Sequence, residues 1–270
     1  MSVQRARLTS PTAELIVEVI GGALVFSHWG APSGAASQDL SRAQIPSVTN
    51  SGFDDVQNPG VMREASRGFL GRSALSGHRN GKAWSSHFEV NTFDANERIV
   101  SISLTDTYAE LSLNYVLTMD SFGVLTLQAE LQNSGKSQYT VNEFIYWLPL
   151  PQEAKQSLDF AGRWSKERQP QRRDIATGTW VRDSREGRSG HNFSIADIAL
   201  TAQTTFQDGQ AWATSIAWSG NSHYLVEKLF DGSVSIGAGE LLLPGELTLG
   251  SGEIYEAPAL VSVFSSQGLD

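Results

Sequence analysis

The chain has 270 residues, of which 40% are hydrophobic and 18% are charged, so it can bury a sizeable core and does not have the composition of a disordered segment. Its formal net charge of -9 at pH 7 disfavours contact with the phosphates of nucleic acids and with anionic lipids. The absence of cysteine excludes disulfides, cysteine-ligated zinc, iron–sulfur clusters and thiol nucleophiles.

The N-terminal residues contain two early arginines but no apolar segment and no small-residue cleavage site, so we expect no secretory signal. No apolar run approaches the roughly 18 residues that a membrane span needs. Together with the missing cysteines, these features predict a protein of the cytoplasm.

Alternation of apolar and polar residues predicts β-strands along most of the chain. The clearest pair is LSLNYVLTM (111–119) and VLTLQAELQ (124–132), separated by a predicted hairpin turn at residues 120–123. The other candidate strands, in chain order, are ELIVEVI (14–20), IVSISLT (99–105), VNEFIYWL (141–148), AWATSIAW (211–218), HYLVEKL (223–229) and ALVSVF (259–264). No segment shows a sustained helical period, so we expect an all-β sandwich or barrel that forms a single domain over residues 1–270.

Two stretches interrupt this pattern. Residues 30–80 are rich in Gly, Ser, Ala and Pro, and residues 150–195 contain a cluster of positive charge. We expect both to be long irregular loops. Long loops on a β scaffold usually serve a function or an interface.

Motifs for metal, cofactor or nucleophile chemistry are missing from the sequence. The five histidines have no partners at metal-binding spacings, and they are His28, His78, His87, His191 and His223. The glycine-rich stretch GAGELLLPG (237–245) departs from a dinucleotide-binding motif, because Leu242 stands where the third glycine belongs and Pro244 interrupts the helix that must follow. There is no GxSxG motif for a serine hydrolase. We therefore expect no metal and no cofactor.

The most unusual stretch is GRWSKERQPQRRD (162–174), which gathers positive charge around Trp164 in an acidic protein. Its cations are Arg163, Lys166, Arg168, Arg172 and Arg173. One interpretation is a set of arginine–carboxylate pairs that orders a loop. A second is a nucleic-acid patch, which the net charge disfavours. A third is a sugar site or domain interface, with the tryptophan as a platform and the arginines as its support.

Several ordered motifs resemble those of bacterial family 36 α-galactosidases. They are GRWSKERQPQRR (162–173), SREGRSGH (184–191), WSGN (218–221), GAGELLLPGE (237–246), YEAP (255–258) and FSSQGLD (264–270). GRSALSGHR (71–79) and AWSSHF (83–88) are similar to the actinobacterial branch. The resemblance covers nearly the whole chain.

This resemblance implies the N-terminal β-supersandwich of the family, which is related in fold to galactose mutarotases. In the family a catalytic (β/α)8 barrel follows this region and carries the catalytic carboxylates, so we expect no catalytic residue in the present chain. The resemblance implies that the chain is either a separately produced domain or a truncated product. The resemblance places Trp164 toward the galactose site, with Arg163, Glu167 and Arg168 as loop support. Relatives have a galactose-contacting aspartate before an R-A pair near residue 42; here the sequence is QDLSRA, and that role does not transfer to Asp39.

The leading expectation is therefore a non-catalytic accessory domain of a retaining α-galactosidase, which shapes the substrate entrance and the domain and oligomer interfaces. Its expected partners are its own catalytic barrel, galactosides and further copies of itself. One alternative is a free-standing carbohydrate-binding module. A less favoured one is a mutarotase-like epimerase, for which His191 and His223 are the candidate acid–base residues.

Overall fold

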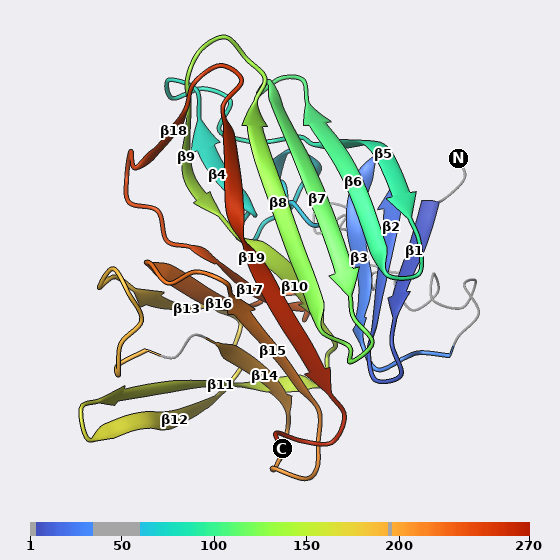
Figure 1. The fold of residues 1–270 in the computed structure, drawn as a ribbon, viewed down its shortest axis with the longest axis vertical. Coiled ribbons are helices and arrows are strands. Elements are labelled where there is room, and N and C mark those ends of the chain that lie inside the picture. Colours follow the sequence, from blue (N-terminus) through green and yellow to red (C-terminus); the bar gives the residue numbers. More distant parts are fainter. Residues whose placement is uncertain (1–3, 35–59, 194–195) are drawn as a thin grey trace.

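The computed structural model of the protein describes residues 4–34, 60–193 and 196–270. Within these residues the strands form four antiparallel sheets (Figure 1). The largest sheet has nine strands, in the spatial order β12 (Lys166–Asp174), β11 (Ala154–Arg163), β14 (Asp197–Thr201), β15 (Ala211–Ile216), β19 (Ile254–Ser265), β8 (Leu125–Asn133), β7 (Leu111–Met119), β6 (Ile99–Asp106) and β5 (Glu89–Ala95).

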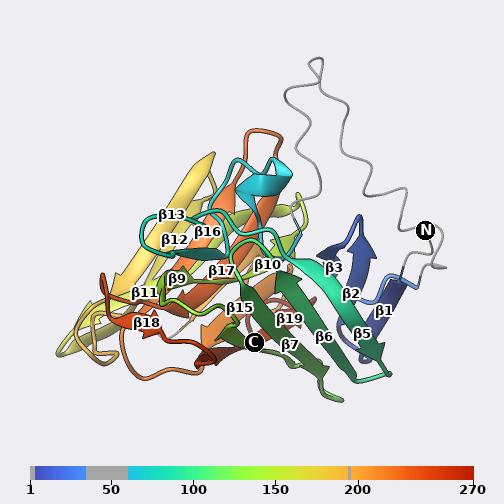
Figure 2. The same cartoon turned by 90° about the horizontal axis from the view of Figure 1, so that it is seen from above.

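Three smaller sheets pack against the large one. The first contains β1 (Gln4–Thr9), β2 (Glu14–Ile20) and β3 (Ala23–Gly30), and it lies across from β5, β6 and β7 in the view from above (Figure 2). The second has the order β10 (Tyr146–Leu150), β17 (Val234–Glu240), β16 (Ser222–Lys228) and β13 (Gly178–Ser184). The third has the order β18 (Leu247–Leu249), β9 (Tyr139–Phe144) and β4 (Leu75–His78). A short 3-10 helix, η1 (Ala65–Arg67), precedes β4.

The alternation in the sequence produces the core. On β7, Leu111, Leu113 and Tyr115 are fully buried, whereas Ser112 is half-buried and Asn114 is exposed. The apolar side chains of all four sheets meet in one hydrophobic cluster. This arrangement confirms the predicted all-β sandwich, because each sheet buries one apolar face against another sheet.

The predicted hairpin turn between β7 and β8 is confirmed. The amide of Gly123 donates to the carbonyl of Asp120 at 3.2 Å, and Gly123 has a φ of 87° that favours glycine. The Asp120 carboxylate accepts hydrogen bonds from the amides of Phe122 and Val124. A local side chain therefore closes the turn that the local sequence predicts.

The prediction of one strand over residues 141–148 is wrong. The chain there forms the end of β9 and most of β10, which belong to different sheets. At the junction, the amide of Ile145 donates to the carbonyl of Ala74 at 2.8 Å. Because Phe144, Ile145 and Tyr146 are all buried, the apolar run gives no sign of the break.

The prediction of an irregular loop over residues 150–195 is also wrong, because this region contains β11, β12 and β13. Strand β12 is exposed along most of its length, so it has no apolar alternation to reveal it. It is a strand because its backbone pairs with β11 from Gln156 opposite Asp174 to Arg163 opposite Lys166.

The prediction for residues 30–80 is confirmed only in part. Residues 60–74 contain turns and η1 but no strand, and β4 follows them. Residues 35–59, with Asp39 among them, lie outside the described residues. In the part of the chain that the structure describes, no helix has the length and apolar character to cross a membrane.

Candidate functional site

Strands β11 and β12 form a hairpin that projects from the large sheet at the lower left of Figure 1. Pairing of Arg163 with Lys166 leaves Trp164 and Ser165 as a two-residue turn. Ser165 has a φ of 64°, the left-handed conformation that such tight turns use. The Glu167 carboxylate accepts a hydrogen bond from the Ser165 amide at 2.9 Å and so stabilises the turn.

Trp164 stands at the tip of this hairpin with 77% of its surface exposed. Its indole contacts the ring of His191 edge to face, with the ring centroids 5.5 Å apart and the planes at 78°. The two segments touch again at Gly162, where a Cβ atom would lie 2.6 Å from the carbonyl oxygen of His191. Glycine is therefore required for this close approach. The segment of His191 (residues 189–193) thus supports the indole through the His191 ring.

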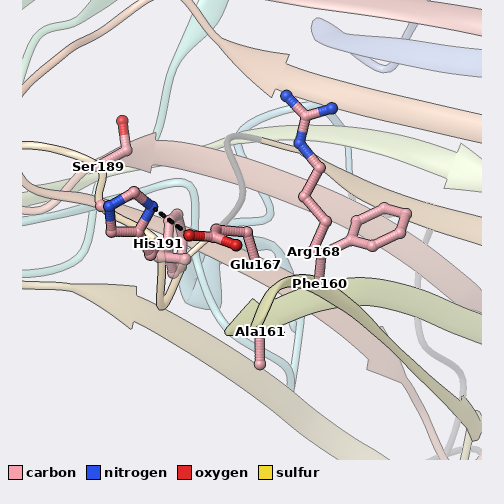
Figure 3. A pocket seen from close by; sticks show the side chains of 8 residues that line it. Phe160, Ala161, Glu167, Arg168, Ser189 and His191 are labelled. Atoms are coloured by element: carbon pink, nitrogen blue, oxygen red, sulfur yellow. Dashed lines mark ion pairs between the residues drawn. The ribbon is translucent and has the colours of Figure 1, made fainter. Parts of the chain in front are cut away.

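A pocket of about 610 Å³ lies between the hairpin and the segment of His191. Its lining residues are Phe160, Ala161, Glu167, Arg168, Ser189, Gly190, His191 and Phe193. Figure 3 shows the Glu167 carboxylate and the His191 imidazole pointing toward each other, with Nδ1 and Oε1 separated by 3.7 Å. Since about half of each side chain is exposed, both can hydrogen-bond to the hydroxyl groups of a bound ligand.

The electrostatics of the pocket favour an ionised Glu167. The backbone amides of Glu167 itself and of Ser165 hold the pKa of this carboxyl below its ordinary value, and His191 adds to the shift. Glu167 is thus a hydrogen-bond acceptor at neutral pH.

The two flanking arginines behave differently from Glu167. Arg163 and Arg168 are exposed, and Figure 3 shows Arg168 extending away from the Glu167–His191 pair. Neither side chain makes a hydrogen bond or an ion pair with the residues that the structure describes. Their supporting role, like the sugar-contacting role of Trp164, stays a prediction.

A set of buried charges lies beneath the hairpin. Asp159 of β11 is 3% exposed and pairs with Arg173 of β12 at 3.1 Å and with Arg182 of β13 at 3.5 Å. The guanidinium of Arg173 also lies over the ring of Trp180 on β13, 4.2 Å from its centroid. These contacts join the edge of the large sheet to the edge of the four-stranded sheet.

Asp197, at the start of β14, completes this set. Burial, followed by the negative charge of Asp159, raises the pKa of Asp197 to about 7. Its Oδ2 atom has no hydrogen-bond partner among the described residues. The arginine–carboxylate network that was one interpretation of the sequence therefore exists, with Asp159 as the acid that pairs with Arg173 and Arg182 and with Asp197 buried nearby.

The family model of the glycosyl hydrolase family 36 N-terminal domain matches residues 22–250 of the chain. The chain belongs to this family. An α-galactosidase of Escherichia coli is 31% identical over 98% of the chain and 37% of its own length. A probable α-galactosidase C of Aspergillus flavus is 23% identical over 98% of the chain and 36% of its own length. The chain thus spans less than two fifths of the length of these curated relatives.

The crystal structure of the family 36 α-galactosidase AgaA from Geobacillus stearothermophilus has the same fold. It superposes with a TM-score of 0.84 at 18% identity, over 98% of this chain and 41% of that one. The predicted family and its β-sandwich are therefore confirmed for this family 36 N-terminal domain.

The two histidines considered for epimerase chemistry lie in different places. His191 faces Glu167 at the open pocket, whereas His223 is 4% exposed on β16. Nδ1 of His223 lies 3.7 Å from Glu143, and burial lowers the pKa of His223. Among the described residues that line the pocket, His191 is present and His223 is not. Among the described residues, no group of three or more metal-ligating side chains occurs either.

The sequence analysis did not predict Phe193 as part of the pocket wall, nor Asp159 and Asp197 as the buried acids near Arg173 and Arg182. Asp159 has one local signal, since it stands between the apolar residues Leu158 and Phe160 in a strand. Asp197 has none, because its burial results from contacts between β11 and β14. Which acids support the hairpin therefore depends on contacts between strands that are far apart in the sequence.

Proposed function

We propose that this chain is the N-terminal accessory domain of an α-galactosidase and that its β11–β12 hairpin forms one wall of the substrate entrance. The observation that carries the proposal is the position of Trp164, which is exposed at the hairpin tip and contacts His191, a residue that lines the pocket. An aromatic ring of this kind packs against the apolar C–H face of a pyranose and excludes water from it. The relatives named α-galactosidases support galactosides as the ligands.

The proposed complete protein hydrolyses terminal α-galactosyl residues with retention of configuration, using carboxylates of a catalytic barrel that follows this domain. The domain itself supplies no catalytic residue, metal or cofactor. Its proposed partners are that barrel, galactosides and further copies of the same protein, and its proposed location is the cytoplasm. The motifs at 71–79 and 83–88 support an origin in the actinobacterial branch.

The test is Trp164→Ala in a protein that carries this domain together with a family 36 catalytic domain. Loss of the stacking surface should lower kcat/KM for an α-galactoside by about tenfold to a hundredfold, or about 1–3 kcal/mol. Trp84→Ala, which removes another exposed tryptophan (70% exposed), is the matched control and should leave kcat/KM unchanged. Unaltered kinetics for Trp164→Ala would remove this residue from the substrate site.

The chain alone should show no turnover of aryl α-galactosides above background, since the catalytic carboxylates of the family lie in the barrel. Activity that co-purifies with the chain, and that disappears when one of its own carboxylates is mutated, would contradict the accessory role.

The pocket within the chain also favours a second candidate, a carbohydrate-binding module that acts without a barrel. Calorimetric titration of the chain with galactose and raffinose separates the two. Saturable binding that Trp164→Ala abolishes would support the module, and a mutarotation assay on the same sample tests the epimerase alternative.

A further inference from the structure

Arg182 of β13 connects three separate parts of the molecule. Its Nη2 atom donates to the carbonyl oxygen of Asn192 at 2.7 Å, and its Nη1 atom lies 3.5 Å from the Asp159 carboxylate. Its guanidinium also lies 5.6 Å from the centroid of Phe193, which lines the pocket. One side chain of the four-stranded sheet thus contacts the hairpin strand β11 and the segment of His191.

We propose that Arg182 is a positioning residue that, through Asp159 and Asn192, sets how Trp164 of the hairpin packs against His191 of the pocket wall. The inference goes beyond the substrate role of Trp164, although its effect on catalysis rests on that proposed function. Arg182 itself does not line the pocket, and the indole of Trp164 packs against His191 and not against Arg182. Arg182 therefore acts through its neighbours.

The covalent chain transmits each contact of Arg182 to the site. Asn192 directly follows His191, and the side-chain amide of Asn192 donates to the Glu186 carboxylate at 2.8 Å, which adds a second contact to the same segment. On the hairpin, Asp159 directly precedes Phe160 and Ala161 of the pocket wall. Loss of Arg182 therefore removes one contact from each of the two walls at once.

The burial of these groups explains why the contacts are strong enough to hold a geometry. Asp159 is 5% exposed at its side chain and Arg182 is 22% exposed, so water screens their attraction only in part. Asp159 keeps Arg173 as a second partner at 3.1 Å when Arg182 is removed. We therefore expect the variant to fold, with the pocket walls displaced rather than the sandwich lost.

The experiment is ¹⁹F NMR of the whole chain labelled with 5-fluorotryptophan, in which Trp164→Phe assigns the signal of Trp164. In Arg182→Ala the Trp164 signal should move toward that of the free amino acid and become narrower, because the contact with His191 loosens. The signals of the buried Trp29 and Trp212 should stay in place and report an intact core.

Matched variants separate positioning from a general loss of charge. Arg185→Ala removes an exposed arginine whose ion-pair partner among the described residues is the nearby Asp183, at 2.8 Å, and it should leave the Trp164 signal unchanged. Arg182→Lys keeps the positive charge without the planar fork, so it should restore the signal in part. Arg182→Gln keeps one amide donor for Asn192, and it should give an intermediate shift.

A Trp164 signal in folded Arg182→Ala that matches the wild type would overturn the proposal. If Arg182→Ala unfolds, as shown by loss of the Trp29 and Trp212 signals, Arg182→Gln decides: an unmoved Trp164 signal in that folded variant overturns the proposal, and a moved one supports it.

The kinetic arm distinguishes failure of the positioning role from failure of the proposed function. In the protein with a catalytic domain, Arg182→Ala should lower kcat/KM by about tenfold, since small displacements near reacting groups are costly. If Trp164→Ala leaves the kinetics unchanged while Arg182→Ala still moves the NMR signal, the substrate role fails and the positioning stands. If Trp164→Ala lowers kcat/KM and Arg182→Ala alters neither measurement, the positioning fails.

Discussion

Arginines in two regions of the domain have opposite surroundings. Arg63 is 4% exposed, pairs with the buried Glu227, and lies between two aromatic rings, 4.5 Å from the centroid of Phe69 and 3.9 Å from that of Trp147. At the hairpin tip, Arg163 and Arg168 are exposed and their side chains have no partner among the described residues. A buried charge needs a partner because desolvation is costly, whereas a solvated charge does not. Arginine thus makes a buried ion pair in one region and stays solvated at the surface in the other.

Charges that begin at the buried Arg63–Glu227 pair form a continuous chain between sheets. Glu227 also accepts hydrogen bonds from the hydroxyl of Thr179 at 2.6 Å and from the amide of Arg72 at 3.2 Å. Arg72 pairs in turn with Glu143 of β9. Residues 60–74, which contain no strand, are thereby attached by charge to β16 and β9, in addition to the backbone hydrogen bond between Ala74 and Ile145. Substitutions in the buried region and at the hairpin should therefore change the free energy of unfolding by very different amounts.

The largest effect is expected for Glu227→Ala. The substitution leaves the Arg63 guanidinium buried without its carboxylate and removes the partner of Thr179, so the free energy of unfolding should fall by about 3–5 kcal/mol. Burial already lowers the pKa of Arg63 to about 10, and Glu227 opposes that shift. Urea unfolding followed by circular dichroism measures the change.

Glu186→Ala is the matched control, because that exposed carboxylate contacts Asn192 at the surface. It should change the free energy of unfolding by less than about 1 kcal/mol. Equal losses for the two variants would contradict the comparison between buried and exposed charge.

An intermediate effect that depends on pH is expected for Asp197→Asn. Asp159 of β11, Arg173 of β12 and Arg182 of β13 influence the Asp197 carboxyl, whose pKa is about 7 in the fold against an ordinary value of 3.8. The folded state therefore keeps a proton between about pH 4 and pH 7 that the unfolded chain releases. The contribution of this group to stability is complete below about pH 4 and is lost as pH rises through 7.

Asparagine does not titrate, so the stability of the variant relative to the wild type should increase from pH 4 to pH 8. The measurement is the free energy of unfolding in urea at each pH. Asp174→Asn, at an exposed carboxylate of the same hairpin, should run parallel to the wild type. A parallel profile for Asp197→Asn as well would show that Asp197 is ionised in the fold.

The smallest effect on stability is expected for Trp164→Ala in the chain alone. Because 77% of Trp164 is exposed, its truncation should change the free energy of unfolding by no more than about 0.5 kcal/mol. Trp212→Ala sharpens the contrast: Trp212 is 1% exposed and donates to the carbonyl of Trp29 at 3.1 Å, so its loss should cost about 3–5 kcal/mol. Thermal unfolding of both variants tests this, and a melting temperature that falls equally in both would place Trp164 in the core.

Features that depend on neighbouring residues could be predicted from the amino-acid sequence. Alternation predicted β7 and β8, and Asp120 with Gly123 predicted the turn between them, because side chains two apart share a face and turn residues act locally. The ordered motifs identified the family, and the polar surroundings of Trp164 were consistent with its exposed position.

Contacts between residues far apart in the sequence depend on the folded arrangement of the strands. Arg63 and Glu227 are 164 positions apart, and no local pattern predicts that they pair. Exposed β12 shows no period of two, since pairing with β11 makes it a strand whatever its side chains, and the buried break at Ile145 is set by contact with Ala74. Asp159 likewise holds the hairpin only because β11, β12 and β13 come together in the fold. The spacing of hydrophobic residues indicates which face of a strand is buried, so the sandwich could be predicted. Charge pairing and the edges of sheets depend on distant segments, so the residues that support the candidate site could not.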